Sequence, residues 1–390
     1  KPSSAASDVY KRQVCDWFYP AALANGYELD VVNKVWEILR AFASFGFCKA
    51  HAAAFALPTY QSAWLKAHHT AAFFAGVLTH DPGMYPKRVI LDDARQWGIT
   101  IAPLDINKSD ETYRIESSEE VGKNPYQAEN LKSTGKTLGL PDARGYAIRI
   151  GLATLHGIDD YEITSIIKHR PYIDLADFIY RSGVSRPTAE RLVKVGAFDQ
   201  LHKINELSLT RRDLILHLQD IYKLNGERNL GGQLALELEP PKLKASGLPD
   251  LNKSEIVKTE IDLLGMDISN HLIEFYGEFL NSIGAVRSCD LIKERAGATV
   301  LVAGVKVALQ TPPVRSGRRV MFLTLDDGFG CNDITFFEDV QRERAGLLRN
   351  SWLFLIKGEV RRTGPRGLSI RAIDAWELVD SYERWRSLKR

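Results

Sequence analysis

The stretch TVLVAGVKVALQTPPVRSGRRVMFLTLDDGFGCNDITFF, residues 299–337, decides the fold of the C-terminal part of the chain. Runs rich in β-branched and aromatic residues replace the helical spacing that precedes them, which is typical of strands. Strands are predicted over Val300–Val307, Val320–Leu325, Asn332–Phe337, Trp352–Val360 and Leu368–Ile373, with a turn at Asp326–Gly330 and a helix over Glu338–Leu348. This order, with the helix between the third and fourth strands, predicts a five-stranded OB-fold β-barrel.

Upstream of this stretch, apolar residues recur at the spacing of helices. Helices are predicted within Val14–Pro103, Gly145–Leu201, Glu206–Leu224 and Lys253–Ile283, with a short extended piece at Ile99–Pro103. Pro58 should kink or divide the helix over Ala52–His68. Asp105–Glu120 is polar and is predicted to be a loop. The predicted fold class is therefore a multidomain α+β protein, with an all-α region followed by the barrel.

Composition bounds the possible classes of protein. The chain has 390 residues, of which 45% are hydrophobic and 26% charged, as in soluble globular proteins. A typical domain takes roughly 100–200 residues, so two to four domains are expected. The four cysteines are scattered without a CxxC pair, which argues against a zinc site and a disulfide framework. No apolar run approaches the ~20 residues that span a bilayer, so we expect a cytoplasmic protein without a membrane partner.

The first thirteen residues, KPSSAASDVYKRQ, are polar and aperiodic, and the chain begins at Lys1 rather than Met. We expect this stretch to be a non-native remnant and the chain to be a fragment. The C-terminal limit of the natural protein is left open.

The charge distribution says more than the net charge of +2. From Gly297 to Leu325 there is no acidic residue. OB barrels bind single strands through basic grooves and stacking aromatic rings. The candidate DNA-binding residues of the barrel are Arg315, Arg318, Arg319, Phe322, Arg361, Arg362 and Arg366. Alternation places Phe336 and Phe337 on opposite faces, and the sequence does not decide which lies in the core. The alternative is a solvated loop and a barrel used only for packing.

The segment FGFCKAHAAAFALPTYQSAWLK, residues 45–66, places Lys49 and His51 at the start of a helix. Free amides at a helix start attract anions, and a lysine and a histidine beside them suit a triphosphate or a DNA phosphate. Alternatively, Lys49 is solvated and His51 caps the helix.

A second candidate binding site is the hairpin His156-Gly157-Ile158-Asp159, between two predicted helices. Small residues let hairpin amides approach a DNA phosphate. The hairpin resembles that of a helix-hairpin-helix motif, in which a second glycine usually stands at the position of Asp159, and the charge of Asp159 would oppose phosphate. A helical scaffold without DNA contact is the alternative.

A short apolar motif, Gln233-Leu234-Ala235-Leu236, lies in the predicted linker. This motif resembles a peptide that binds a sliding clamp. Such a peptide ends in an aromatic residue or leucine that fills a pocket, whereas Glu237 occupies that position here. A bland linker is the alternative.

Several sequence segments resemble segments of bacterial C-family DNA polymerases, the family of the DNA polymerase III alpha subunit. FGFCKAHAAAFALPTYQSAWLKAHH, residues 45–69, is similar to the fingers signature, and ILDDARQWGITIAPLDINKS, residues 90–109, to the stretch that follows it. LATLHGIDDYEITSIIKHR, residues 152–170, resembles a helix-hairpin-helix. GRRVMFLTLDDGFG, residues 317–330, resembles the barrel segment. The fingers phrase looks closest to the error-prone branch, and the chain stops soon after the barrel.

The resemblance implies a domain order: a remnant (1–13), fingers (14–125), a helix-hairpin-helix region (126–230), a linker with helices (231–296), the OB domain (297–378) and a tail (379–390). It implies Lys49 and His51 as nucleotide-binding residues. It also implies that the catalytic carboxylates belong to a palm domain outside this chain, which would then be inactive alone.

The parent enzyme is expected to use Mg²⁺, whereas no cofactor is expected on this chain. Primer-template DNA and deoxynucleoside triphosphates are the expected partners. A sliding clamp, through Gln233, Leu234 and Leu236, and accessory translesion proteins are further possibilities. A fragment of a replicative alpha subunit and a non-enzymatic DNA-binding module remain the alternatives.

Overall fold

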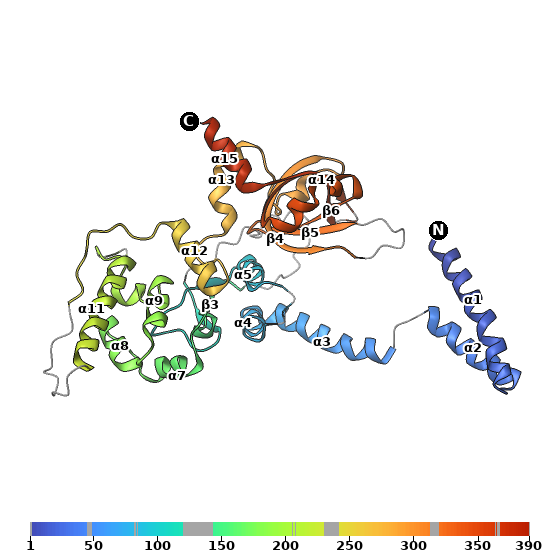
Figure 1. Cartoon of the computed structure of the whole chain (residues 1–390), viewed down its shortest axis with the longest axis horizontal. Helices are drawn as coiled ribbons and strands as arrows, with labels where there is room; N and C mark the ends of the chain where they lie inside the picture. The colour runs from blue at the N-terminus through green and yellow to red at the C-terminus, as the bar shows by residue number, and fades with distance from the viewer. Residues whose placement is uncertain are drawn as a thin grey trace. The chain divides into compact units, whose positions relative to one another are not determined.

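The computed structural model describes residues 2–44, 49–81, 83, 85–119, 143–204, 206, 208–229, 242–312, 320–362, 364 and 367–389 (Figure 1). The chain forms two compact units, Lys1–Leu65 and Lys66–Arg390. The boundary between the units falls within a helix, α3 (Lys49–His68). Each unit is described by itself.

The first unit is a pair of adjacent helices followed by the start of a third. α1 spans Pro2–Ala24, α2 spans Leu29–Ser44 and α3 spans Lys49–His68. The α1–α2 pair is held by stacking of Phe18 on Trp36, with ring centroids 5.6 Å apart. The stretch expected to be aperiodic is helical within α1. α3 is one helix through Pro58, so the proline does not divide it, and a kink at this position stays a prediction.

The second unit begins with two helices and a small sheet. α4 is Thr70–His80 and α5 is Lys87–Gln96. The sheet consists of β1 (Thr100–Ala102), β2 (Arg114–Ser117) and β3 (Tyr146–Arg149). The strand order is β1-β3-β2, with β1 parallel and β2 antiparallel to β3.

This sheet corrects the all-α expectation for the helical region and, at Arg114–Ser117 only, the prediction of a loop over Asp105–Glu120. β2 is a polar strand, RIES, that lies mostly exposed, so it lacks the apolar alternation that marks a strand in a sequence. Its pairing with β3 is reinforced by an ion pair between Glu116 and the buried Arg149 guanidinium. The pairing partner, rather than local composition, therefore makes this segment a strand.

Short helices follow and share one core with the sheet. They are η1 (Leu152–Thr154), α7 (Asp160–Lys168), α8 (Leu175–Ser182), α9 (Arg186–Lys194), α10 (Asp199–His202) and α11 (Arg211–Asn229). Phe178 contacts both Tyr172 and Phe198 edge to face, with centroids 5.0 Å apart in each pair. Leu214 and Leu218 of α11 are fully buried, as their helical spacing predicts.

Four short helices lead to the barrel: α12 (Lys253–Leu264), η2 (Leu272–Tyr276), α13 (Gly277–Ser282) and η3 (Leu291–Lys293). α12 begins with a capping box between Asn252 and Glu255, which satisfies amides at its start. No helix among the described segments is long and apolar enough to cross a membrane.

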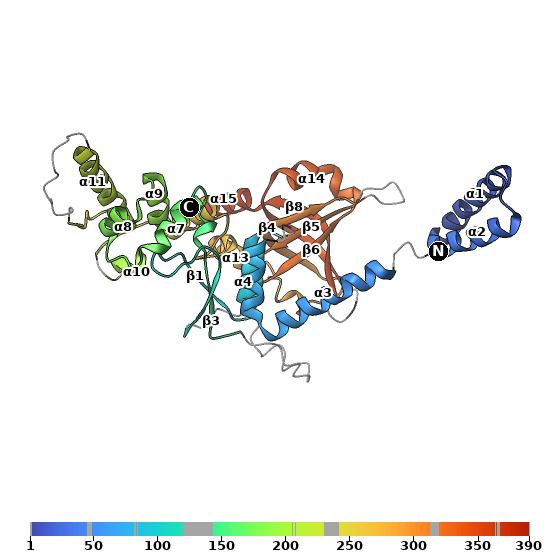
Figure 2. The same ribbon diagram turned by 90° about the horizontal axis from the view of Figure 1, so that it is seen from below.

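The C-terminal part is a closed five-stranded barrel, as the sequence predicts (Figure 2). Its elements are β4 (Thr299–Gln310), β5 (Met321–Asp326), β6 (Cys331–Phe336), α14 (Glu338–Asn350), β7 (Leu353–Arg362) and β8 (Leu368–Glu377), followed by α15 (Leu378–Leu388). The strand order is β4-β5-β6-β8-β7, and only the β6–β8 pair is parallel among them. Leu348 of α14 is buried in the barrel core.

A second apolar cluster lies outside the barrel core. η2, α13 and α15 pack against β4 and β7, burying Phe279, Leu280, Val305 and Leu355 between them. The helices therefore cover this side of the barrel, and a ligand must approach it elsewhere.

Candidate nucleic-acid interface

The predicted hairpin lies between η1 and α7 and is held by protein groups on two sides. The His156 amide and its ring nitrogen Nδ1 bond to carbonyl oxygens near the end of α12, at 2.8 and 3.0 Å. On the other side, Arg191 of α9 donates to the Gly157 carbonyl at 3.0 Å. These bonds fix the hairpin and place a guanidinium group beside it.

Gly157 is required by this arrangement. Its φ is +79°, and a Cβ here would lie 2.4 Å from Nη1 of Arg191. The amides of His156 and Ile158 are bonded to carbonyls within the protein. The Gly157 amide has no acceptor among the described residues, so it is the hairpin amide available to a phosphate.

Asp159 is the N-cap of α7 rather than a free charge. Its carboxylate accepts from the Glu162 amide at 2.7 Å, and the Glu162 carboxylate returns to the Asp159 amide. This capping box explains why an aspartate replaces the usual glycine. The negative charge still lies next to the hairpin, as the sequence predicts.

A second helix-turn-helix, α8–α9, was not recognised as a hairpin from the sequence. Gly183 ends α8 in the left-handed conformation, with φ +65°. Glu162 joins the two hairpins, because it also accepts from the Ser185 amide and from the Thr188 hydroxyl, each at 2.8 Å. Burial raises the pKa of Glu162, but these hydrogen bonds bring it below the ordinary value. The glycine preceding a new helix was the available signal.

On the barrel, one candidate ring faces outward in a row that crosses three strands. Phe322 of β5 is 43% exposed and pairs with Thr335 of β6, which in turn pairs with Arg371 of β8. Since paired residues share a face, this row carries the exposed Phe322 ring and the partly exposed Arg371 guanidinium, which also lies 3.9 Å from Asp339 of α14. Arg371 was missed in the sequence, because a single basic residue in a strand carries no signal.

Phe337 follows Thr335 of this row by two residues, and the guanidinium groups of two arginines lie over its ring. The guanidinium carbons of Arg361 and Arg371 lie 5.8 and 5.3 Å from its ring centroid. Phe336, by contrast, is fully buried in the barrel core. The structure thus decides between the two rings: Phe336 is core, and Phe337 belongs to a partly exposed aromatic and basic cluster.

The remaining barrel candidates fall in different places. Arg362 donates to the carbonyl oxygens of Ile292 and Glu294, so its guanidinium holds the η3 segment. Arg315, Arg318, Arg319 and Arg366 lie outside the described residues, as does the motif Gln233-Leu234-Leu236. We name Phe322, Phe337, Arg361 and Arg371 the outer barrel cluster.

The fingers candidates lie in the first turn of α3, as predicted. α3 begins at Lys49, whose side chain lies outside the described residues. The His51 ring is exposed and contacts the Phe55 ring, with centroids 4.4 Å apart. Both residues belong to the first unit.

A buried polar cluster joins α5, the segment before η2 and the end of β5. His271 Nε2 lies 3.8 Å from Asp92 Oδ2 and 3.5 Å from Asp326 Oδ2. Arg95 pairs with Asp92 at 2.5 Å, and Arg88 with Asp326 at 2.9 Å. All three titratable members are at most 6% exposed.

This cluster has the only spacing for a metal ion that the described residues offer. His271 Nδ1, however, accepts from the Ile273 amide at 3.2 Å, which places the proton of the neutral ring on Nε2, the atom facing the carboxylates. A metal ion would need that nitrogen deprotonated. Two arginines also already neutralise the carboxylates. The geometry suits bound protons better than a cation.

Burial perturbs the pKa values in this cluster. It raises the pKa of Asp92 to about 7, with Asp326 adding to the rise and Arg95 opposing it. Burial also raises the pKa of Asp326, but His271 and Arg88 bring it below its ordinary value. Burial lowers the pKa of His271, and the carboxylates of Asp326 and Asp92 raise it above its usual value. The cluster as a whole therefore holds a proton tightly.

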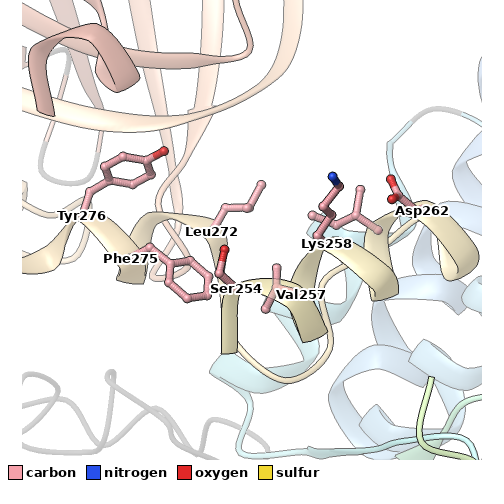
Figure 3. Close-up of a pocket in the computed structure, with 8 residues that line it drawn as sticks. Ser254, Val257, Lys258, Asp262, Leu272, Phe275 and Tyr276 are labelled. Atoms are coloured by element: carbon pink, nitrogen blue, oxygen red, sulfur yellow. The ribbon is translucent and has the colours of Figure 1, made fainter. Parts of the chain in front are cut away.

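A groove runs between α12 and η2 (Figure 3). It is lined by Ser254, Val257, Lys258, Ile261, Asp262, Leu272, Phe275 and Tyr276. Its volume is about 220 Å³, below the roughly 300 Å³ at which small-molecule pockets begin. None of the predicted binding residues lines it.

Two family models match the regions just described. A helix-hairpin-helix motif model matches residues 98–208. A model of an OB-fold nucleic acid binding domain matches residues 300–378. Both elements predicted from the sequence, the hairpin region and the barrel, are confirmed.

Curated relatives cover most of the chain. It is 33% identical over 85% of its length to an error-prone DNA polymerase of Symbiobacterium thermophilum, and 27% identical over 99% to one of Teredinibacter turnerae. It is 27% identical over 88% of its length to the DNA polymerase III subunit alpha of Pasteurella multocida. It covers 32%, 36% and 28% of these proteins respectively. The chain thus spans about a third of the length of the curated relatives it matches.

The order of helices, hairpins and barrel, together with these relatives, shows that the chain belongs to the bacterial C-family DNA polymerases, which include error-prone DNA polymerases and DNA polymerase III alpha subunits.

Proposed function

We propose that the chain is the DNA-holding part of an error-prone DNA polymerase and that the outer barrel cluster binds single-stranded DNA. The main support for this proposal is that the guanidinium groups of Arg361 and Arg371 both lie over the Phe337 ring. The exposed Phe322 ring lies on the same barrel. Bases stack on exposed rings, and guanidinium groups neutralise phosphates. The chain is 27–33% identical to the error-prone enzymes it matches and 25–27% identical to the replicative subunits, which favours the error-prone branch.

In this proposal the hairpins hold the DNA backbone in a sequence-independent way. The Gly157 amide and the neighbouring Arg191 guanidinium are groups that contact phosphate in such motifs. Lys49 and His51, at the start of α3, bind the phosphates of an incoming deoxynucleoside triphosphate.

Polymerisation itself would require more than this chain. Phosphoryl transfer of this type uses metal ions held by carboxylates. Among the described residues, only the buried cluster of Asp92, His271 and Asp326 has a spacing suited to a metal ion. Arginines neutralise both of its carboxylates. We therefore place catalysis, with its Mg²⁺, in the part of the parent enzyme that this chain does not cover.

Salt titrations of DNA binding test the barrel assignment. Changing Arg361 and Arg371 to Ala should weaken binding of a single-stranded oligonucleotide and reduce the slope of log affinity against log salt by about 0.7 for each phosphate that is no longer neutralised. Changing Phe322 and Phe337 to Ala should cost about 1–3 kcal/mol per stacked base and leave the slope unchanged.

The control is Arg386→Ala on the exposed side of α15, which removes one positive charge away from the row of strands. Equal effects of Arg386→Ala and the cluster variants would mean that binding reflects net charge. Wild-type binding by both cluster variants would remove this face of the barrel from the DNA interface.

A further inference from the structure

The buried cluster at the junction of α5 and the barrel contains more polar atoms than its hydrogen bonds satisfy. Asp92 Oδ2, Asp267 Oδ1 and His271 Nε2 are fully buried and have no hydrogen-bond partner among the described residues. A buried carboxylate oxygen without a donor is costly when charged, and neutralises when it can. At least one group of this cluster is therefore expected to keep a proton that it would lose at neutral pH in water.

Three parts of the fold surround this space. α5 contributes Asp92, Arg88 and Arg95, and the segment after α12 contributes Asp267 and His271. The barrel contributes Asp326, with Asp327 and Cys331 beside it. Arg88 also donates to the Lys306 carbonyl of β4, so α5 touches the barrel through this cluster.

Hydrogen bonding decides which group takes the proton. His271 Nδ1 already accepts from the Ile273 amide, so a second proton on the ring would break the cap of η2. Asp326 accepts from Arg88 and from the Gly328 amide, and both its oxygens are engaged. Asp92 Oδ2 has no such bond, although its other oxygen accepts from Arg95.

We propose that Asp92 is held protonated in the native protein. A neutral carboxyl group of α5 then faces the Asp326 carboxylate of the OB barrel across His271. When the proton leaves, the two carboxylates repel each other and the attachment of the barrel weakens. The joint is then a pH-sensitive element of the fold, separate from the DNA-binding surface.

The sign of the pH dependence follows from the direction of the shift. Burial raises the pKa of Asp92 from 3.8 to about 7, so the folded state binds this proton more tightly than the unfolded state. The contribution to stability is complete below the unfolded pKa and is lost as the pH rises through the folded pKa, at about 7. Because the groups are coupled, the cluster titrates as one unit and not as separate residues.

Asp92→Asn in the full chain is the matched test. The amide is isosteric with a protonated carboxyl group, keeps an acceptor for Arg95 and cannot ionise. Thermal melts at pH 5 should give the smaller difference in Tm, because the folded wild type still holds the proton there. At pH 8.5 the Tm of the variant should exceed that of the wild type by roughly 2–6 °C more than at pH 5. Asp93→Asn, at the partly exposed neighbour paired with Lys66, should change Tm by the same amount at both pH values.

A second variant identifies the protonated group. His271→Asn keeps a side-chain acceptor for the Ile273 amide but removes the second ring nitrogen. His271→Asn should retain the pH dependence that Asp92→Asn removes. The reverse result, pH dependence lost in His271→Asn and kept in Asp92→Asn, would overturn the assignment in favour of an imidazolium.

Infrared difference spectra supply a readout from the folded protein that needs no melting transition. Wild type minus Asp92→Asn should show a protonated carboxyl band at pH 5.5 that disappears at pH 9. A rise in the wild-type Tm with added Zn²⁺, reversed by EDTA and absent in Asp92→Asn, would show that the cluster holds a metal ion and would overturn the proposal.

Discussion

At the scale of single residues, the structure separates chemistry that looks equivalent in the sequence. Phe336 and Phe337 are adjacent and identical, yet one fills the barrel core and the other lies beneath two arginines. Arg361 and Arg362 differ in the same way, since the latter donates to backbone carbonyls. Alternation along a strand predicts that such neighbours differ, but the direction is set by partners elsewhere in the chain.

Lys49 is the residue whose change should affect nucleotide use most directly. In the intact polymerase, Lys49→Ala should lower kcat/KM for the incoming nucleotide about ten- to hundred-fold, because a charge-assisted hydrogen bond is worth roughly 1.5–3 kcal/mol. DNA affinity should stay near the wild-type value. Steady-state nucleotide titration measures the effect.

Lys34→Ala, on α2 of the same unit, is the control for loss of a surface charge. A wild-type kcat/KM in a folded Lys49→Ala variant would leave Lys49 without a role in nucleotide binding.

At the scale of elements, the first hairpin combines a structural need with a functional cost. Asp159 caps α7, and its carboxylate lies beside the amide proposed to bind phosphate. Asparagine is as good an N-cap as aspartate, whereas alanine costs about 0.5–2 kcal/mol. The charge and the cap can therefore be varied independently.

Asp159→Asn should leave Tm close to the wild-type value and strengthen binding of duplex DNA, because it removes repulsion without removing the cap. Asp159→Ala should strengthen binding similarly but lower Tm by a few degrees. Fluorescence anisotropy and thermal melts measure both effects. Unchanged DNA affinity in both variants would indicate that the hairpin is a scaffold that does not touch DNA.

Strong local patterns made the elements predictable, and their absence explains the failures. The barrel strands follow from apolar alternation, and the helix between them follows from helical spacing. Gly98 marks the end of α5. β2 escaped prediction because Arg114-Ile115-Glu116 has too little apolar content. The helix-turn-helix of α8 and α9 escaped because the turn carries only one glycine, Gly183.

At the scale of the whole molecule, the least predictable feature is the cluster that joins distant positions. Asp92, His271 and Asp326 are separated by more than fifty residues from one another, so no spacing rule relates them. Most candidate DNA-binding groups, in contrast, lie on motifs that local composition reveals, with Arg371 as the exception. The sequence could thus predict the modules and most of their surfaces, but not how one module is fixed to the next.

The purified chain should not extend a primed template in the presence of Mg²⁺ and deoxynucleoside triphosphates. It should still bind single-stranded DNA in the same buffer, which shows that the preparation is folded. A primer-extension gel, with an intact C-family polymerase as the positive control, measures this. Extension above background that follows the chain through purification would show that it holds a complete catalytic centre.

The pairing of β2 with β3 has a practical consequence. Ser117 and Tyr146 are register partners, and the Ser118 amide bonds to the Gly145 carbonyl at 2.9 Å. The chain therefore leaves the sheet and returns to it at neighbouring positions. Because closing a longer loop adds only about 0.6 kcal/mol for each doubling of its length, this position suits an inserted fluorescent or affinity module, with the rest of the fold serving as an undisturbed host.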